Sequence, residues 1–204
     1  MRDFTRAMND GLVWLPQLGV GRYPVPPERP YDDGYFLRYQ GMAETEMGRA
    51  LTKARIALVA RHYSGSLLDV GIGAGQFVDS RPDTLGYDVN AAGIAWLKER
   101  GKWADLYAGE YDALAFWDSL EHIDDPEEAV SRARECVFVS IPIFSGAEDV
   151  LSSRHFRPDE HIWYFTHEGL IAWFERMGFA CVECNREESR LGREGINSYA
   201  FKRV

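Results

Sequence analysis

From residue 64 onward, short apolar runs alternate with longer stretches whose apolar residues recur at helical spacing. The apolar runs predict strands at 66–70, 84–89, 111–117 and 135–141, with a weaker strand at 103–107. The longer stretches predict helices at 75–80, 91–100, 126–134 and 167–177. This alternation predicts an α/β fold, in which helices cover both faces of a mostly parallel sheet.

The last part of the chain follows a different pattern. Two strand-like segments, FACVECNREE and INSYAFKRV, are separated by a turn around Gly192 and Gly195, with no helical stretch between them. Because strands joined by a short turn pair antiparallel, we expect the last strand to run against the others.

The amino-terminal part has another composition. Residues 15–34 are rich in proline and glycine and predict an irregular, extended segment, and residues 35–62 then predict a helix. The Ser64–Gly65 turn is the expected boundary. We therefore divide the chain into a leader with its helix, 1–63, and a main domain, 64–204. The leader could close over the ligand site as a lid, or it could pack on the outer face of the sheet.

A glycine-rich turn follows the first predicted strand, in the segment LLDVGIGAGQF at 67–77. Glycines at 71, 73 and 75 let the backbone turn tightly and approach a ligand closely, because they have no Cβ atom. In an open α/β sheet, ligands bind at this end of the strands. The N–H groups of the turn can hold an anionic group, and Asp69 can hold a cationic one. A ligand that carries both charges fits better than a bare pyrophosphate.

Asp88 ends the next predicted strand, 17 residues after Gly71. An acid in this position can accept hydrogen bonds from ribose hydroxyls. The alternative is that Asp88 caps the helix predicted from residue 91, a role that Asn90 could also fill.

These motifs together resemble those of the class I S-adenosylmethionine-dependent methyltransferases. DVGIGAGQF resembles their first motif, GYDVN their second, and YDALAFWDSLEHIDDP the region of the fourth strand in small-molecule O-methyltransferases of the ubiquinone-biosynthesis type. The resemblance covers residues 64 to 204. It implies a Rossmann-like sheet of seven strands, of which the last is antiparallel.

The resemblance also implies S-adenosylmethionine as the cofactor and a set of residues around it. Asp69 and the backbone of the glycine turn would face the methionine part, Asp88 the ribose, and two apolar side chains the walls of the pocket. Trp117 and Asp118 would lie near the sulfonium, whose positive charge suits aromatic and electronegative surroundings. The expected cofactor-binding residues are Asp69, Gly71, Ile72, Gly73, Gly75, Phe77, Asp88, Val89, Trp117 and Asp118.

The run Asp118-Ser-Leu-Glu121-His122 has polar residues spaced to lie on one face of a helical turn. We assign Glu121 and His122 as catalytic, with His122 removing a proton from a hydroxyl acceptor and Glu121 orienting it. Two alternatives stay open. The run also resembles the E-x-x-E-H pattern of metal-assisted ubiquinone-biosynthesis and small-RNA 2′-O-methyltransferases, which would make His161 a further ligand. The residues could also merely fix the loop. The assigned site contains no metal.

Composition limits the partners and the compartment. The net charge of −9 over 204 residues disfavours a large nucleic-acid footprint, because such binding depends on lysine and arginine. Three cysteines do not suggest a disulfide framework. The apolar runs are too short to span a bilayer. The first ten residues lack the apolar core of a signal peptide. We expect a cytoplasmic enzyme that methylates a small molecule, with no membrane partner. RNA or DNA methylation, a non-catalytic binding module and NAD-dependent oxidoreduction are the alternatives.

Overall fold

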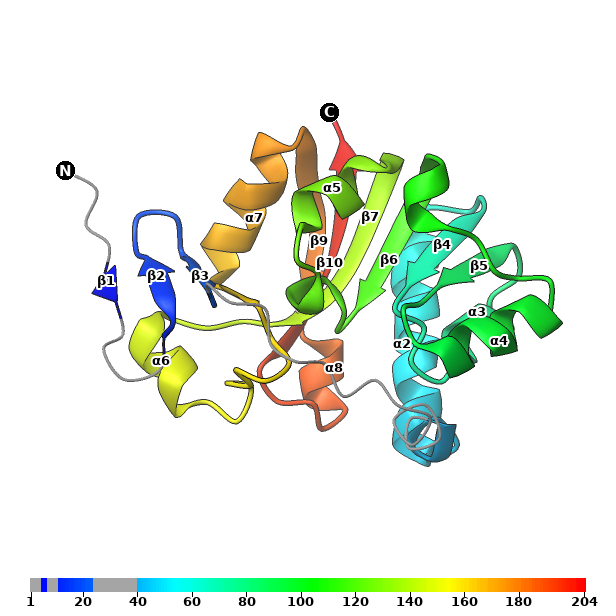
Figure 1. Ribbon diagram of the computed structural model, residues 1–204, viewed down its shortest axis with the longest axis horizontal. Coiled ribbons are helices and arrows are strands. Elements are labelled where there is room, and N and C mark those ends of the chain that lie inside the picture. Colours follow the sequence, from blue (N-terminus) through cyan, green and yellow to red (C-terminus); the bar gives the residue numbers. More distant parts are fainter. Residues whose placement is uncertain (1–4, 7–10, 24–39) are drawn as a thin grey trace.

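The computed structural model describes residues 5–6, 11–23 and 40–204. Its main sheet has six strands in the order β5-β4-β6-β7-β10-β9 (Figure 1). In that order the strands are Thr84–Tyr87, Leu67–Val70, Tyr111–Trp117, Ala133–Pro142, Ile196–Arg203 and Phe179–Asn185. The strands β5, β4, β6 and β7 are parallel, whereas β10 runs antiparallel to both β7 and β9. The predicted α/β class and the antiparallel last strand are confirmed.

The strand predicted at 103–107 is wrong, and within the described residues the main sheet has six strands where seven were expected. Trp103 forms an isolated parallel bridge with Gly86. The Gly86 N–H donates to the Lys102 carbonyl, and the Gly86 carbonyl accepts from the Ala104 N–H. The chain then turns away, because the Asp105 side chain accepts a bond of 3.0 Å from the Tyr107 N–H. This local bond caps the 3-10 helix η1, Leu106–Ala108, and competes with strand pairing.

Helices cover both faces of the main sheet, as predicted. The seven helices within the described residues that have assigned bounds are α2 Glu46–His62, α3 Gln76–Ser80, α4 Ala91–Glu99, α5 Pro126–Ser131, α6 Ala147–Ser152, α7 His167–Arg176 and α8 Glu187–Arg190. Alternate residues of a strand face opposite sides. In β6, Leu114 and Phe116 therefore pack in the cluster that contains α5 and α7, whereas Ala113, Ala115 and Trp117 pack with α2 and α3.

A second, small sheet joins the leader to the main domain. It has the order β1-β2-β3-β8, with bounds Thr5–Arg6, Val13–Leu15, Val20–Arg22 and Trp163–Phe165. The prediction of an irregular segment at 15–34 is therefore wrong at residues 15 and 20–22, which belong to β2 and β3, whereas residues 16–19 form a turn. Residues 24–34 lie outside the described part. Pro16 and Gly19 form the hairpin turn, where Gly19 has a φ of +60°, so these residues connect two strands.

The helix predicted at 35–62 begins later than expected. Residues 40–43 are helical, but α2 itself starts at Glu46, because Thr45 caps it by accepting a 3.0 Å bond from the Gly48 N–H. Residues 35–39 lie outside the described residues. No helix in the described part of the chain is both long and apolar enough to span a membrane.

Candidate functional site

The glycine-rich turn lies between β4 and α3, at the carboxyl end of the parallel strands (Figure 1). Gly71, Gly73 and Gly75 all have a positive φ, between 53° and 78°. A Cβ atom on Gly71 would lie 2.7 Å from the Cβ of Ser119, and one on Gly75 would lie 2.4 Å from the ring of Trp96. The turn therefore needs glycine for its backbone conformation and for its close packing.

Asp88 connects the glycine turn to the end of β5. Its two carboxylate oxygens accept bonds from the backbone N–H groups of Ile72, at 3.0 Å, and of Asn90, at 2.8 Å. Asn90, and not Asp88, caps α4, because its side chain accepts a 2.8 Å bond from the Ala92 N–H. The alternative of Asp88 as a helix cap is thereby wrong. The carboxylate keeps further lone pairs for a ligand.

Two buried polar groups at the ends of β4 and β6 have no hydrogen-bond partner among the described residues: the Oδ1 atom of Asp69 and the indole Nε1 of Trp117. Asp69 is only 1% exposed. Burial raises the pKa of its carboxyl well above the usual range, an effect that nearby Arg55 opposes and Asp88 strengthens. A buried polar atom without a partner is costly, and one that faces a binding site can be satisfied by the ligand.

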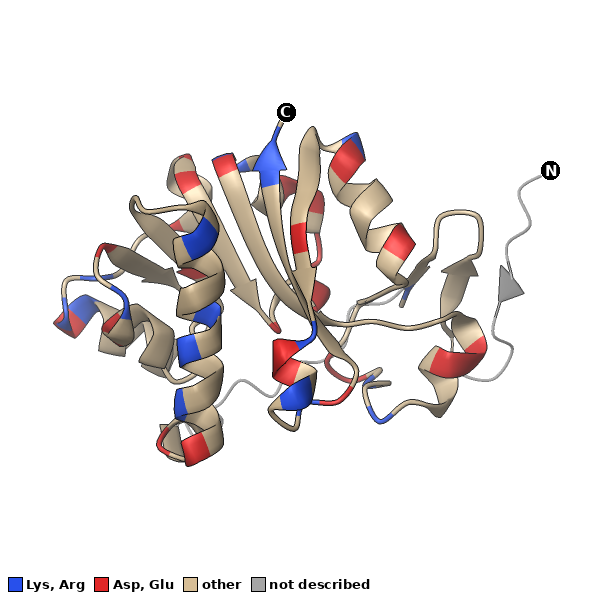
Figure 2. Cartoon of the chain, turned by 180° about the vertical axis from the view of Figure 1, so that it is seen from behind, with Lys and Arg blue, Asp and Glu red and all other residues tan. Residues whose placement is uncertain are grey.

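A network of ion pairs beside these groups was not predicted from the sequence. Asp118, whose φ is +54°, pairs with Arg193, and its carboxylate lies 3.5 Å from Nη2 of Arg55. Both arginines also bind Glu188. Arg55 stands on α2, whose basic residues are spread along the helix (Figure 2). The sequence contained a signal for this network: the charged Arg55 lies between the buried residues Leu51 and Leu58, on the same face of the helix.

Glu121, His122 and His161 form a second cluster. The 3-10 helix η2, Leu120–His122, carries the first two, and the loop after α6 carries His161. One possible ligand atom from each residue lies within 4.8 Å of those of the other two. The centroids of the two imidazole rings are 4.7 Å apart. His122 is fixed by a 2.8 Å contact between its Nδ1 and the carbonyl oxygen of Glu160. The cluster does not include Asp118, which is engaged by the arginines.

The pKa values of Glu121 and His161 are both shifted in the direction that favours the neutral form. Glu121 is 1% exposed, and neither carboxylate oxygen has a partner in the described structure. Burial and the negative charge of Asp118 raise its pKa well above the usual range. Burial and the neighbouring His122 lower the pKa of His161 well below its usual value. A neutral imidazole and a neutral carboxyl can each exchange a proton with a ligand.

The remaining predicted residues fall into two environments. Val89 is 59% exposed at the end of β5, where a ligand ring could cover it. Phe77, in contrast, is buried, and its ring packs edge-on against Trp117 with centroids 5.2 Å apart. Phe77 therefore packs against the Trp117 ring and helps to fix its position. A role of Phe77 in lining the cofactor pocket stays a prediction.

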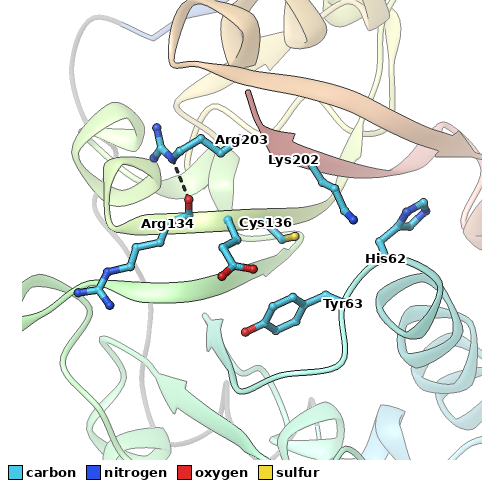
Figure 3. Close-up of a pocket in the computed structure, with 7 residues that line it drawn as sticks. His62, Tyr63, Arg134, Cys136, Lys202 and Arg203 are labelled. Atoms are coloured by element: carbon cyan, nitrogen blue, oxygen red, sulfur yellow. Dashed lines mark hydrogen bonds between the residues drawn. The ribbon is translucent and has the colours of Figure 1, made fainter.

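A cavity of about 430 Å³ lies at the opposite, amino-terminal edge of the parallel strands (Figure 3). Its lining includes four basic side chains, those of His62, Arg134, Lys202 and Arg203. Three of these are already engaged: Arg134 with Glu110, His62 with Glu183, and Arg203 with backbone carbonyls. This cavity is remote from the glycine turn, so we do not assign it to the site.

Comparison with known proteins identifies the family. The model of the methyltransferase domain family matches residues 40–184. The chain belongs to this family. Its fold is that of the class I S-adenosylmethionine-dependent methyltransferases, so the predicted resemblance is confirmed at this level. No curated protein sequence is similar enough to count as a match.

Solved structures show the same fold at low sequence identity. Magnesium protoporphyrin IX methyltransferase from Synechocystis is 13% identical, with a TM-score of 0.60 over 85% of this chain and 96% of that chain. A methyltransferase from Archaeoglobus fulgidus is 18% identical, with a TM-score of 0.59 over 84% and 100%. The cyclase SpnF is 15% identical, with a TM-score of 0.56 over 79% and 83%. Since one of the three is described as a cyclase, the fold alone does not determine the reaction.

Proposed function

We propose that this methyltransferase transfers the methyl group of S-adenosylmethionine to an oxygen atom of a small molecule. The observation that carries the proposal is the pair of acids at the ends of adjacent strands. Asp69 has an unpartnered buried oxygen, and Asp88 holds the glycine turn between them. The ligand that fits carries an ammonium group at one end and a ribose at the other.

The described residues supply the other contacts that this cofactor needs. We assign Arg55 to the carboxylate of the methionine part. Its guanidinium carbon lies 5.3 Å from the centre of the Trp117 ring, which supports this assignment. Asp88 accepts hydrogen bonds from the ribose hydroxyls, and the exposed Val89 packs on the adenine. We assign the Trp117 ring to the positive sulfonium. A contact of Asp118 with the sulfonium stays a prediction, because its carboxylate already pairs with Arg193 and lies 3.5 Å from Arg55.

The Glu121–His122–His161 cluster supplies the acceptor chemistry. A hydroxyl must lose its proton as the new bond to carbon forms. His122 accepts this proton. The Glu160 carbonyl, rather than Glu121, orients the imidazole, because neither Glu121 oxygen has a partner among the described residues. Alignment of the acceptor oxygen with the methyl group provides most of the remaining acceleration.

The same three side chains also have the donor set for a divalent cation, two imidazoles and one carboxylate. A bound cation would lower the pKa of the acceptor hydroxyl and orient it. Dialysis against a chelator separates the two roles. Activity that survives dialysis supports His122 as a base, whereas activity that is lost and restored by Mg²⁺, Mn²⁺ or Zn²⁺ supports a metal.

Calorimetric titration with S-adenosylhomocysteine tests the cofactor assignment, with NAD as the comparator. The expected result is binding at one site per chain and no heat with NAD. An absence of heat with S-adenosylhomocysteine would contradict the proposal and favour a non-catalytic module. A panel of phenols, catechols and short RNAs, incubated with methyl-labelled cofactor, then identifies the class of acceptor. Transfer to RNA alone would overturn the small-molecule part of the proposal.

A further inference from the structure

Glu188 is a buried carboxylate outside the strand ends that carry the recognised motifs. It lies on the short helix α8, in the connection between β9 and β10, and is only 1% exposed. Four donors surround it. Nε and Nη2 of Arg55 lie 2.7 and 3.0 Å from its two oxygens, Nη1 of Arg193 lies 2.7 Å away, and Oγ of Ser140 also lies 2.7 Å away.

The bidentate bond from Arg55 uses one side of the guanidinium and leaves another side available. Nη1 of Arg55 has no partner among the described residues. It is also not among the buried atoms that lack a partner, so it is accessible to a ligand. The guanidinium stacks over Trp117, and its charge acts on Asp69. The available side of Arg55 therefore belongs to the region in which we place the methionine part of the cofactor.

Without Glu188, the two arginines would lack this common negative partner. Arg193 and Arg55 repel each other, and Asp118 alone would have to hold both. A free arginine side chain also populates many rotamers, and the entropy lost when it is fixed opposes binding. A fixed carboxylate with bidentate geometry removes most of this penalty before the ligand arrives.

We propose that Glu188 is a positioning residue for the cofactor site: it holds the Arg55 guanidinium in the orientation that binds the carboxylate of the cofactor, and it holds Arg193 on Asp118. The carboxyl-terminal helix α8 is thereby part of the cofactor site. This inference rests on the proposed function of the glycine-turn region.

The experiment measures the Kd for S-adenosylhomocysteine by calorimetry in Glu188→Gln and in a matched control, Glu183→Gln. Glu183, on β9, also connects α2 to the carboxyl-terminal part of the chain, through Arg61 and His62. Among the described contacts it has none with Arg55. We expect Glu188→Gln to weaken binding roughly tenfold or more, and Glu183→Gln to weaken it less than about twofold. Equal effects of the two substitutions would overturn the proposal.

A double-mutant cycle distinguishes positioning from a general effect on the fold. If Glu188 acts through Arg55, Glu188→Gln causes no further loss of affinity in the Arg55→Gln background. Additive losses would overturn the proposal. Where Glu188→Gln does not fold, Ser140→Ala replaces it in the same cycle. Loss of the Ser140 bond is expected to weaken binding about two- to threefold only when Arg55 is present, and a loss that is equal in both backgrounds would contradict the role.

The two proposals fail in different ways. If the wild-type protein does not bind S-adenosylhomocysteine, the proposed function fails. If the wild type binds and Glu188→Gln binds equally well, only the positioning role fails.

Discussion

Asp69 combines deep burial with an oxygen that has no partner in the described residues. We propose that the ammonium group of the cofactor binds this oxygen. The raised pKa of its carboxyl shows that the ligand-free environment favours the protonated form. An ammonium group reverses this preference, because it stabilises the carboxylate. Cofactor binding and proton release should therefore be coupled at this residue.

This coupling predicts a pH dependence of binding. The affinity for S-adenosylhomocysteine should fall as the pH is lowered through the raised pKa of Asp69, because the protonated carboxyl pairs poorly with ammonium. Calorimetry in two buffers with different ionisation enthalpies should also detect a released proton. For Asp69→Asn we expect weaker binding with a flatter pH profile, and a profile as steep as that of the wild type would rule out Asp69 as the titrating group.

Substitution at Asp88 should affect binding far more than substitution at His122. Asp88→Ala removes the proposed ribose acceptor, the bond to the Ile72 N–H that holds the turn and the bond to the Asn90 N–H. We therefore expect the Kd for S-adenosylhomocysteine to rise about ten- to a hundredfold. His122→Ala should leave this Kd nearly unchanged and reduce turnover. Intact turnover in His122→Ala would exclude both the base and the metal role.

At the scale of elements, the order of the strands brings the site together. The ends of β4, β5 and β6 meet at one edge, and the turns that follow them carry the glycines, Asp88 and Asp118. These turns lie within hydrogen-bonding or packing distance of one another: Ser119 Oγ donates a 2.5 Å bond to the Val70 carbonyl. The conformation of one turn therefore affects the others.

Two glycine-to-alanine substitutions test this packing. Gly71 and Gly101 both have a positive φ, but a Cβ at Gly71 would lie 2.7 Å from Ser119, whereas none of the described atoms lies within 4 Å of one at Gly101. Gly101→Ala should cost roughly 1 kcal/mol in the free energy of unfolding, from backbone strain alone. Gly71→Ala should cost roughly 2–4 kcal/mol and also weaken cofactor binding. Equal midpoints of denaturant unfolding would contradict the tight packing.

The sequence allowed local features to be predicted better than long-range ones. The glycine turn and the acids at strand ends depend on residues a few positions apart, so periodicity and turn chemistry sufficed to find them. The pairing of β3 with β8 and the binding of Arg55 by Glu188 join residues more than 130 positions apart. No periodicity encodes such contacts. The 3-10 turn at Leu106–Ala108 escaped prediction for a different reason: a local Asp105 bond outweighed the strand propensity.

Over the whole molecule, ionic contacts join α2, from the first third of the chain, to the carboxyl-terminal elements α8 and β9. Arg55 binds Glu188, and Arg61 and His62 bind Glu183. Burial alone would raise the pKa of Glu188, but the two arginines outweigh it and lower the value to about 2. Hydrogen bonds from Arg61 and His62 lower the pKa of Glu183 to about 2 as well, against a smaller effect of burial.

These lowered values predict how stability depends on pH. A carboxyl whose pKa is lower in the folded state stabilises the fold above its unfolded value of about 4.3, and this contribution is lost as the pH falls towards 2. The thermal midpoint should therefore decrease between pH 5 and pH 2. In Glu183→Gln the decrease should be smaller by an amount equivalent to on the order of 1 kcal/mol, after allowance for solvent screening. Circular dichroism melts at several pH values check this, and parallel curves for the two proteins would contradict it.

The most direct measurement is a crystal structure of the protein grown with S-adenosylhomocysteine. We predict that the amino group of the ligand contacts Asp69, its carboxylate contacts Arg55, and its ribose hydroxyls contact Asp88. Crystals grown in saturating ligand that show it elsewhere, or that show Asp69 and Asp88 contacted only by protein and solvent, would contradict this assignment.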